Sequence, residues 1–568
     1  MTYVQRTICP YDCPTSCGLL AETDGKKILR VKGDKTHPAN KGLICGKMQH
    51  YEESINSEKR ILTPLRRTGK KGSGQFMPIT WEEAGNEIAE RFLNICREDG
   101  PQAILPAVYS GVMGQIQRKC GEAFFNRLGA CSLVLTLCAS AKGAGYSAVA
   151  GKTGCLDPRE LENSDFFLIW GSNIMATRLQ ILPLLARKRK EGKQVILIEA
   201  CGRDSASLCD KAVYIRPGTD GALALAMMHV LWREHLEDED FLRNQADGYE
   251  QFLPEIRKAT PEWAQGITGI PAEVIEELAH VYGKAKAPAI VLGSGLSRYG
   301  NGGMTVRLIT ILSAFTGAWK RPGGGICGCD HNLGDFVDTN RITRPDLRKE
   351  PARIVNINQL SSALNAEGKD KIRAFYVYAG NPVNSVCNQT GLLKGVARED
   401  LFTVVHERFM TDTALYADII LPATFSVEQT DCFKPYGYGT FAVANKIIDP
   451  PGQCKSNWDT FCFLAGKLGF EEDYFKLLLV HYPDEFMGIL EDYPIDLALC
   501  GHAHGGQVRI PFVGGLYATG QGFFPKLVDG FHQIGNSNVI ISRGLGSSHI
   551  IPRINNKPEL CVVDLCWY

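Results

Sequence analysis

Four cysteines near the amino terminus are the residues of this chain best suited to bind an inorganic cofactor. Three intervening residues separate Cys9 from Cys13 and Cys13 from Cys17, and Cys45 follows after a further 27. Thiolates are the ligands of iron–sulfur clusters, and three close cysteines plus a distant one are typical of a loop that wraps such a cluster. Structural zinc also accepts four cysteines, although usually as two close pairs. The spacing therefore favours a cluster and leaves zinc, or plain core cysteines, as the alternatives.

A second set of candidate residues follows apolar runs further along the chain. Gly171, Ser172 and Asn173 come directly after the run at 166–170, and Glu199 ends the next run. A turn of small residues between a strand and a helix suits backbone donors that face a diphosphate, and an acid after the next strand suits ribose hydroxyls. The full GxGxxG pattern is missing, so ordinary strand-end turns explain these residues equally well.

The apolar pattern predicts the scaffold that must position these residues. Strands are expected at 166–170, 195–198, 289–292, 375–378 and 402–405, with a helix at 182–190 between the first two. Near-continuous apolar strands separated by helices indicate parallel sheets that are covered on both faces. A capping box formed by Thr80 and Glu83 predicts the start of another helix. The expected fold class is therefore α/β and multidomain.

Length and composition set further bounds. A chain of 568 residues is too long for one compact core. Its 62 basic and 62 acidic residues balance, so nothing global indicates nucleic acid as a partner. No apolar run is long enough to predict a membrane span, and the first residues lack a signal core, which predicts a cytoplasmic protein. Clustered cysteines in a reducing compartment are more often ligands or catalysts than disulfides.

The motifs around the cysteines resemble the start of a known family. The segment Cys-Pro-Tyr-Asp-Cys-Pro-Thr-Ser-Cys-Gly at 9–18 is followed by Lys-Gly-Leu-Ile-Cys-Gly-Lys at 41–47. Both are similar to molybdopterin oxidoreductases, which include formate dehydrogenases, nitrate reductases and relatives of dimethyl sulfoxide reductase. Further matches follow in order: Leu-Thr-Pro-Leu at 62–65, Trp-Glu-Glu-Ala at 81–84, Trp-Gly-Ser-Asn at 170–173, Arg-Pro-Gly-Thr-Asp at 216–220, Gly-Asn-Pro at 380–382 and Ala-Asp-Ile-Ile-Leu-Pro at 417–422.

The resemblance implies a role for each motif. The four cysteines would hold a [4Fe-4S] cluster, and Lys47 would connect that cluster electronically to a pterin. Two guanine-dinucleotide pterins would be held by Gly171, Ser172, Asn173, Glu199, Arg203, Gly218, Thr219 and Asp220. One departure concerns the segment after the second strand, where the family often shows Asp-Pro-Arg. This chain reads Glu-Ala-Cys-Gly-Arg at 199–203, so the acid is kept and the arginine is displaced.

A protein ligand to molybdenum or tungsten is expected at a loop tip. By resemblance the candidate is Cys138, which precedes Gly145 by seven residues as the ligand does in family members that use cysteine or selenocysteine. Ser140 is the alternative if the register shifts by two, and a buried packing cysteine is the simplest alternative. The metal would oxidise or reduce a small-molecule substrate by two electrons, and the cluster would relay them singly to a redox partner protein or subunit.

The resemblance also implies a division into domains. Residues 1–60 would form a small iron–sulfur domain, residues 61–160 and 330–470 one pterin-binding α/β domain, and residues 161–329 a second, Rossmann-like one. These pterin-binding domains are expected to contain doubly wound parallel sheets. Residues 475–568 would form a separate α/β-sandwich fragment.

The carboxyl-terminal segment shows a different resemblance. Its residues His481, His502 and His504, with Gly-His-Ala-His-Gly-Gly at 501–506, are similar to the end of calcineurin-like metallophosphoesterases. Histidines at strand ends can bind a divalent metal, but a two-metal site also needs bridging carboxylates, and no suitably spaced set precedes them. The expectation is a join near residue 470 between two truncated genes, with the oxidoreductase impaired by a missing β-rich domain. A metal-dependent phosphoesterase and an inactive fusion product are the alternative functions.

Overall fold

The structure is a computed structural model, and it describes most of the chain up to residue 470. The described residues are 2–151, 154–202, 204–329, 338–470, 477–480, 497–500, 509–510, 514–515, 517–518, 522–523, 529–534 and 537–542. Contacts divide the chain into two units, Met1–Leu468 and Gly469–Tyr568. No helix among the described residues is both long enough and apolar enough to cross a membrane.

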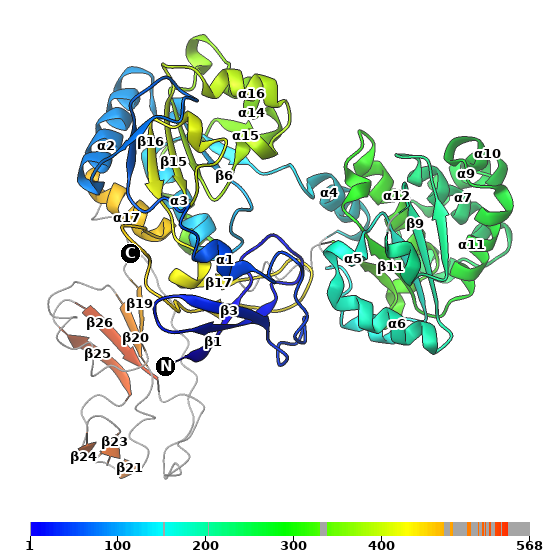
Figure 1. The fold of residues 1–568 in the computed structure, drawn as a ribbon. Coiled ribbons are helices and arrows are strands. Elements are labelled where there is room, and N and C mark those ends of the chain that lie inside the picture. The colour runs from blue at the N-terminus through cyan, green and yellow to red at the C-terminus, as the bar shows by residue number, and fades with distance from the viewer. Residues whose placement is uncertain are drawn as a thin grey trace. The chain divides into compact units, whose positions relative to one another are not determined.

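The cysteine-bearing segment begins with a small antiparallel sheet (Figure 1). Its strands are β1 (Tyr3–Ile8), β2 (Gly18–Thr23) and β3 (Ile28–Gly33), followed by helix α1 (Tyr51–Ile55). Cys9 directly follows β1 and Cys17 directly precedes β2, and the Cys9 amide donates to the Cys17 carbonyl at 2.8 Å. The pairing of β1 with β2 therefore closes the loop that carries the first three cysteines.

A five-stranded parallel sheet occupies the middle of the chain. Its order is β10-β9-β8-β11-β12, from β8 (Phe166–Trp170), β9 (Gln194–Glu199), β10 (Lys211–Tyr214), β11 (Pro288–Leu292) and β12 (Gly325–Cys327). The chain adds strands on one side of β8 and then returns to place β11 on its other side. Such a reversal of strand order is a topological switch point, where α/β sheets form a ligand crevice at the carboxyl ends of their strands.

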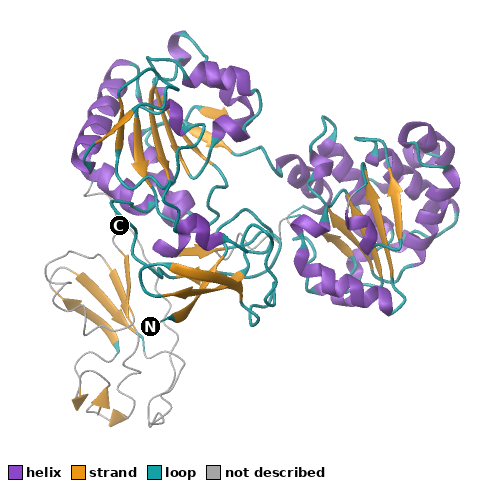
Figure 2. Ribbon diagram, in the orientation of Figure 1, coloured by secondary structure: helices purple, strands orange, loops and turns teal. Residues whose placement is uncertain are grey.

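Helices cover both faces of this sheet, as Figure 2 shows. On β8, Leu168 and Trp170 pack in one buried cluster and Phe167 and Ile169 in another, so both faces are apolar. The helices of this part are α4 (Ser140–Ala150), α5 (Ile174–Thr177), α6 (Leu182–Lys190), α7 (Asp220–Arg233), α8 (Glu239–Gln245), α9 (Tyr249–Lys258), α10 (Pro261–Thr268), α11 (Ala272–Lys284) and α12 (Gly302–Phe315).

A six-stranded sheet combines segments from before and after the five-stranded one. Its order is β5-β4-β16-β15-β14-β6, from β4 (Leu65–Arg67), β5 (Phe76–Pro78), β6 (Ile104–Val108), β14 (Ala374–Tyr378), β15 (Phe402–Glu407) and β16 (Ile419–Pro422). Strands β6, β14, β15 and β16 are parallel, whereas β4 runs antiparallel to β16. All three polar loops after β14, β15 and β16 thus emerge at the same edge.

Helices flank this sheet as well. They are α2 (Trp81–Glu98), α3 (Gln115–Leu128), α13 (Asn340–Thr343), α14 (Leu360–Leu364), α15 (Pro382–Ser385), α16 (Gln389–Val396) and α17 (Asn457–Lys467). Thr80 and Glu83 form the predicted capping box of α2. Two short pairs complete this unit: β7 (Ser132–Val134) with β13 (Ile354–Asn356), and β17 (Asp431–Phe433) with β18 (Ala442–Ala444).

The second unit contains a four-stranded sheet among its described residues. Its order is β19-β20-β26-β25, from β19 (Leu477–Val480), β20 (Leu497–Cys500), β25 (Gly530–Ile534) and β26 (Ser537–Ile541). Two-residue strands pair as β21 (Arg509–Ile510) with β22 (Gly514–Gly515) and as β23 (Tyr517–Ala518) with β24 (Gly522–Phe523). His481, His502 and His504 lie outside the described residues, so their predicted metal site has no structural account.

The α/β multidomain fold class is confirmed, and each of the five expected strands pairs in parallel with its neighbours. The boundaries of the individual domains remain a proposal: residues 1–60, 61–160 with 330–470, 161–329 and 475–568.

Replacement of Gly293 by alanine should destabilise the chain, because the loops after β8 and β11 touch at this residue. A Cβ atom on Gly293 would lie 1.7 Å from the carbonyl oxygen of Gly171. Relief of such a clash requires the two loops to separate, at a cost of about 1–3 kcal/mol or more. Urea denaturation measures this loss. The matched control is Gly300→Ala, whose new Cβ would meet nothing within 4 Å, and an equal midpoint for the two variants would contradict the prediction.

Candidate functional site

A cavity of about 430 Å³ lies at the switch point of the five-stranded sheet. Its lining joins the two sets of residues singled out from the sequence. One side contributes Cys9, Cys13, Cys17, Cys45 and Lys47, and the other contributes Gly171, Ser172, Asn173, Glu199 and the loop 293–295. The structure therefore brings together segments that are more than a hundred residues apart in the chain.

The four thiols of this cavity are largely removed from water. Cys9 and Cys17 are buried, and Cys13 and Cys45 are half-buried. Burial raises the pKa of Cys17 to about 12, and the neighbouring Cys13 contributes to the shift. Burial likewise raises the pKa values of Cys9 and Cys13. Thiols in this setting ionise only when a cation replaces the proton, as happens when metal binds.

Four thiolates can serve as the ligands of an iron–sulfur cluster or of a structural zinc ion. Among the described residues, no three His, Cys, Asp or Glu side chains converge on one point as ligands of one metal ion do. A zinc ion needs four sulfur atoms about 2.3 Å from one centre. In a [4Fe-4S] cubane each cysteine binds a different iron, so the four sulfur atoms stand further apart.

The opposite wall of the cavity is made of backbone turns. Gly171 has a φ of +57°, a left-handed conformation that favours glycine. The side-chain oxygen of Asn173 accepts a hydrogen bond from the Ser205 hydroxyl at 3.1 Å, which fixes the turn. One carboxylate oxygen of Glu199 accepts from the amide of Ala200 at 2.9 Å. These contacts orient the turn and leave the second Glu199 oxygen available to a ligand.

Three of the predicted pterin ligands lie outside the lining of this cavity. Gly218 and Thr219 precede α7, and the Thr219 hydroxyl donates to the Arg216 carbonyl at 2.7 Å. Asp220 is buried, and its Oδ1 accepts from the indole nitrogen of Trp170 at 2.9 Å. Arg203 lies outside the described residues. A nucleotide role for all four remains a proposal.

Tyr299 is a residue near this second set that the sequence reasoning missed. A Cβ atom on Gly218 would lie 3.4 Å from its ring, and the charges of Asp220 and Glu199 raise its pKa further after burial. An aromatic ring beside two acids suits a purine base that stacks and donates hydrogen bonds. A single tyrosine within a glycine-rich loop carries no sequence signal of its own.

Cys138 lies in the loop between β7 and α4, half-buried and beside the cavity rather than in its lining. Tyr109, at the end of β6, shares a hydrogen bond with its side chain. Tyr436 lines the cavity and is close enough for the charge of Cys138 to raise its pKa, although burial is the main cause. The alternative ligand, Ser140, donates its hydroxyl to the Leu135 carbonyl at 3.3 Å.

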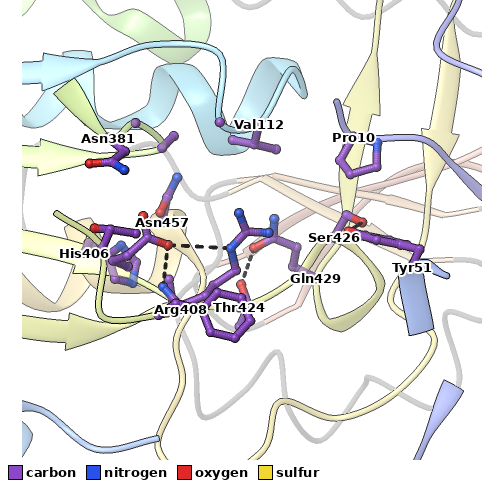
Figure 3. A pocket seen from close by; sticks show the side chains of 17 residues that line it. Pro10, Tyr51, Val112, Asn381, His406, Arg408, Thr424, Ser426, Gln429 and Asn457 are labelled. Atoms are coloured by element: carbon purple, nitrogen blue, oxygen red, sulfur yellow. Dashed lines mark hydrogen bonds and ion pairs between the residues drawn. The ribbon is translucent and has the colours of Figure 1, made fainter. Parts of the chain in front are cut away.

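A second cavity, of about 270 Å³, lies at the carboxyl edge of the six-stranded sheet (Figure 3). Its walls come from the loops after β6, β14, β15 and β16 and from the start of α17, with two residues from the cysteine-bearing segment. The labelled side chains are Pro10, Tyr51, Val112, Asn381, His406, Arg408, Thr424, Ser426, Gln429 and Asn457. In the sequence, the Gly-Asn-Pro match at 380–382 indicates only the family, and no pattern predicts this cavity.

Polar and charged contacts hold the walls of the second cavity. Phe425 lies between two guanidinium groups, with Arg408 4.4 Å and Arg60 4.8 Å from its ring centroid. Arg60 is itself fixed by a buried ion pair with Glu428 at 2.5 Å. His406 is buried, and its Nδ1 has no hydrogen-bond partner among the described residues. An unsatisfied buried nitrogen that borders a cavity is suited to a polar ligand.

Two cavities at the carboxyl ends of parallel strands, one of them bordered by four thiols, are features suited to an enzyme with an iron–sulfur cluster and nucleotide-like cofactors. Two family profiles match the chain: Molybdopterin oxidoreductase over residues 60–467 and Molybdopterin oxidoreductase Fe4S4 domain over residues 2–57. The chain belongs to the molybdopterin oxidoreductase family and carries its Fe4S4 domain.

Individual relatives agree with this assignment. The chain is 38% identical over 474 residues to the probable oxidoreductase YoaE of Bacillus subtilis, covering 83% of this chain and 69% of that one. It is 27% identical over 503 residues to formate dehydrogenase H of Escherichia coli, with 82% and 68% covered. Acetylene hydratase from Pelobacter acetylenicus shares its fold, with a TM-score of 0.72 and 23% identity over 82% of this chain and 70% of that one.

The family matches end at residue 467 and do not include the carboxyl-terminal segment. The predicted phosphoesterase resemblance, the fusion of two genes and the divalent metal at His481, His502 and His504 gain no support from them. None of the three is proposed here.

The pH dependence of stability should reveal the buried His406 of the second cavity. Burial lowers its pKa to about 4 from 6.5. Between these values the unfolded chain binds a proton that the folded chain does not, so stability falls as pH drops from 6.5 towards 4. Between neutral pH and pH 5, the free energy of unfolding should fall by roughly 2 kcal/mol less in His406→Gln than in the wild type. Urea titrations at both pH values measure this, with the exposed His50→Gln as control, and parallel losses in all three proteins would refute it.

Proposed function

We propose that this chain is a two-electron redox enzyme that acts on a small molecule through a molybdenum or tungsten centre and a [4Fe-4S] cluster. One observation carries the proposal: a single cavity is lined by the four cysteines, Lys47 and the switch-point turn. When bound, the pterin-held metal would supply a centre that changes oxidation state by two. The residues described above would bind, orient and insulate these groups.

The cysteine loop would hold the cluster on one side of the cavity. Cys9, Cys13, Cys17 and Cys45 supply four thiolates, and Gln180 donates its amide to the Cys17 sulfur at 3.2 Å. Hydrogen bonds to ligand sulfur stabilise the reduced form and so tune the potential of a cluster. Lys47 follows Cys45 and lines the same cavity, so it would stand between cluster and pterin.

The switch-point turn would hold one pterin dinucleotide. Gly171, Ser172 and Asn173 would face its diphosphate, and Glu199 the ribose. Support for a guanine site beyond them comes from the proximity of Tyr299 to Gly218, Asp220 and Glu199. Thr219 and Arg203 complete the proposed set.

The cavity of the six-stranded sheet would take the second dinucleotide. It lies at the carboxyl ends of parallel strands and is closed by the cysteine loop rather than by a switch point. Its lining offers a cation at Arg408, amides at Asn381, Gln429 and Asn457, and the unsatisfied Nδ1 of His406. These groups match the phosphate and base of a nucleotide.

Cys138 would bind the metal directly. The hydrogen bond with Tyr109 restricts its side chain, and α4 begins two residues later. Both features hold a ligand in one orientation, which a reactive centre requires. Electrons would leave or enter through the cluster to a redox partner protein or subunit.

Loss of a cluster ligand should remove iron from the protein. The chain purified without oxygen should contain about four iron and about four sulfide per molecule. Cys17→Ala should lose most of both, because the remaining three thiols cannot complete the ligand set. Iron and sulfide analysis measures the effect. The matched control is Cys120→Ala, since Cys120 is also buried and its thiol donates to the Gln117 carbonyl of its own helix. Zinc in place of iron would contradict the proposed iron–sulfur cluster.

Cys138→Ala should abolish turnover and leave the cluster unchanged. The substitution removes a metal ligand but touches none of the four cluster thiols. The dye-linked oxidation or reduction of candidate substrates measures turnover, and electron paramagnetic resonance of the reduced chain measures the cluster. Full turnover in this variant would exclude Cys138 as ligand, and Ser140→Ala then tests the alternative register.

A further inference from the structure

Two buried cations line the switch-point cavity in addition to the cysteines, Lys47 and the switch-point turn. Lys142 lies in the first turn of α4 and is 4% exposed. The Arg178 residue, directly after α5, is 7% exposed. Both line the cavity that the cysteines and the switch-point turn share.

The two cations converge on one residue, Gly328, directly after β12. Lys142 Nζ donates to the Gly328 carbonyl at 2.7 Å and to the Ser294 hydroxyl at 3.2 Å. A Cβ atom on Gly328 would lie 2.8 Å from Nη2 of Arg178. Two positive charges therefore stand side by side at the carboxyl edge of the sheet.

Neither cation has a carboxylate partner among the described residues. Within the described part of the chain, their charged ends contact neutral groups: two oxygens for Lys142 and the Cys327 sulfur, at 3.9 Å, for Arg178. Burial lowers the pKa of Lys142, and the nearby Arg178 adds to this effect. A buried charge without a counter-ion is strongly unfavourable, and a pair of like charges is worse. Such a pair is explained when an anion from outside the chain completes it.

Position and charge identify the anion. The cavity also contains the turn at Gly171–Asn173 and the loop at 293–295. The amides of Gly171 and Gly293 donate to strand carbonyls, whereas the later amides of each segment suit phosphate oxygens. Arginine binds phosphate through a planar fork and lysine as a point charge, and together they match two negative charges. The acids in the same lining, Asp12 and Glu199, would repel an anion placed next to them, which favours the end near Gly328.

We propose that Lys142 and Arg178 clamp a phosphate group of the pterin dinucleotide and that this contact fixes α4 against the five-stranded sheet. The proposal rests on the proposed function for the source of the phosphate. Cys138 lies one helical turn before Lys142, so the clamp would also position the metal ligand. Lys142 and Arg178 are in this sense positioning residues that link cofactor loading to the geometry of Cys138.

The test uses the full chain from cells that make no molybdopterin, with inorganic pyrophosphate and guanosine diphosphate as probes. Calorimetry should show binding of both by the wild type, and Lys142→Met or Arg178→Met should each weaken it roughly tenfold or more. Lys142→Arg should bind nearly as the wild type does. The matched control is Lys188→Met, because Lys188 is also buried but has a carboxylate partner, Glu191, at 3.4 Å.

A second readout separates the clamp from a merely structural lysine. In the chain without ligand, Lys142→Met should unfold at the same or a higher temperature than the wild type, because a repulsive charge has been removed. Hydrogen exchange of residues 138–150 should slow when pyrophosphate binds to the wild type and not when it is added to Lys142→Met. A loss of stability without ligand, or unchanged affinity in both methionine variants, would overturn the proposal.

The source of the phosphate is tested separately. In cells that make molybdopterin, Lys142→Met and Arg178→Met should retain less pterin per chain than the wild type, with iron content unchanged. If both variants lose pyrophosphate binding but keep full pterin, the pterin is excluded as the occupant. A wild type that binds pyrophosphate but contains no pterin would refute the proposed function and leave the anion site itself intact.

Discussion

The close approach of two loops at the switch point is the constraint on which the main cavity depends. Strands β8 and β11 are neighbours and parallel, but the chain leaves them towards opposite sides of the sheet. Their loops touch so closely that Gly293 has no room for a side chain beside the carbonyl of Gly171. Because the backbones meet there without side chains, the space beyond them stays open at the strand ends. The amides of Gly171 and Gly293 donate to the carbonyls of Ile198 and Trp170 in the sheet, so only amides further along each loop can face a ligand.

The same geometry accounts for the unusual charges in the cavity. Burial disfavours ionised thiols and ionised lysine alike, yet the lining contains four cysteines, Lys142 and Arg178. Apolar side chains would satisfy a purely structural role at lower cost. Burial of these groups is unfavourable while the cavity is empty. It becomes favourable when the thiols bind metal cations and the two cationic side chains bind an anion. These groups thus destabilise the folded chain when the cavity is empty, and a bound cofactor can relieve that destabilisation.

The sequence predicts some of this arrangement well and some of it not at all. Strand β8 has the predicted bounds because its five residues are apolar on both faces, and the cysteine spacing alone favours a cluster over zinc. Lys142 gives no such signal, since it reads as one lysine in a helix of small residues. Its role depends on a contact with Gly328, 186 positions away. Contacts between residues so far apart in the chain depend on the order of the strands in the sheet. The local sequence pattern does not determine that order.

The two cavities are connected through the loop that carries the cysteines. Pro10 lines the cavity of the six-stranded sheet, whereas its neighbours Cys9 and Tyr11 line the cavity of the five-stranded sheet. Tyr51, from the helix after Cys45, also reaches the former cavity and hydrogen-bonds Ser426 at 3.0 Å. The parallel strands of the six-stranded sheet follow one another in chain order, so no switch point opens a crevice within it. Its cavity instead needs the cysteine loop as a wall. A cluster held by that loop would therefore border both nucleotide sites, and a change in the loop would affect both.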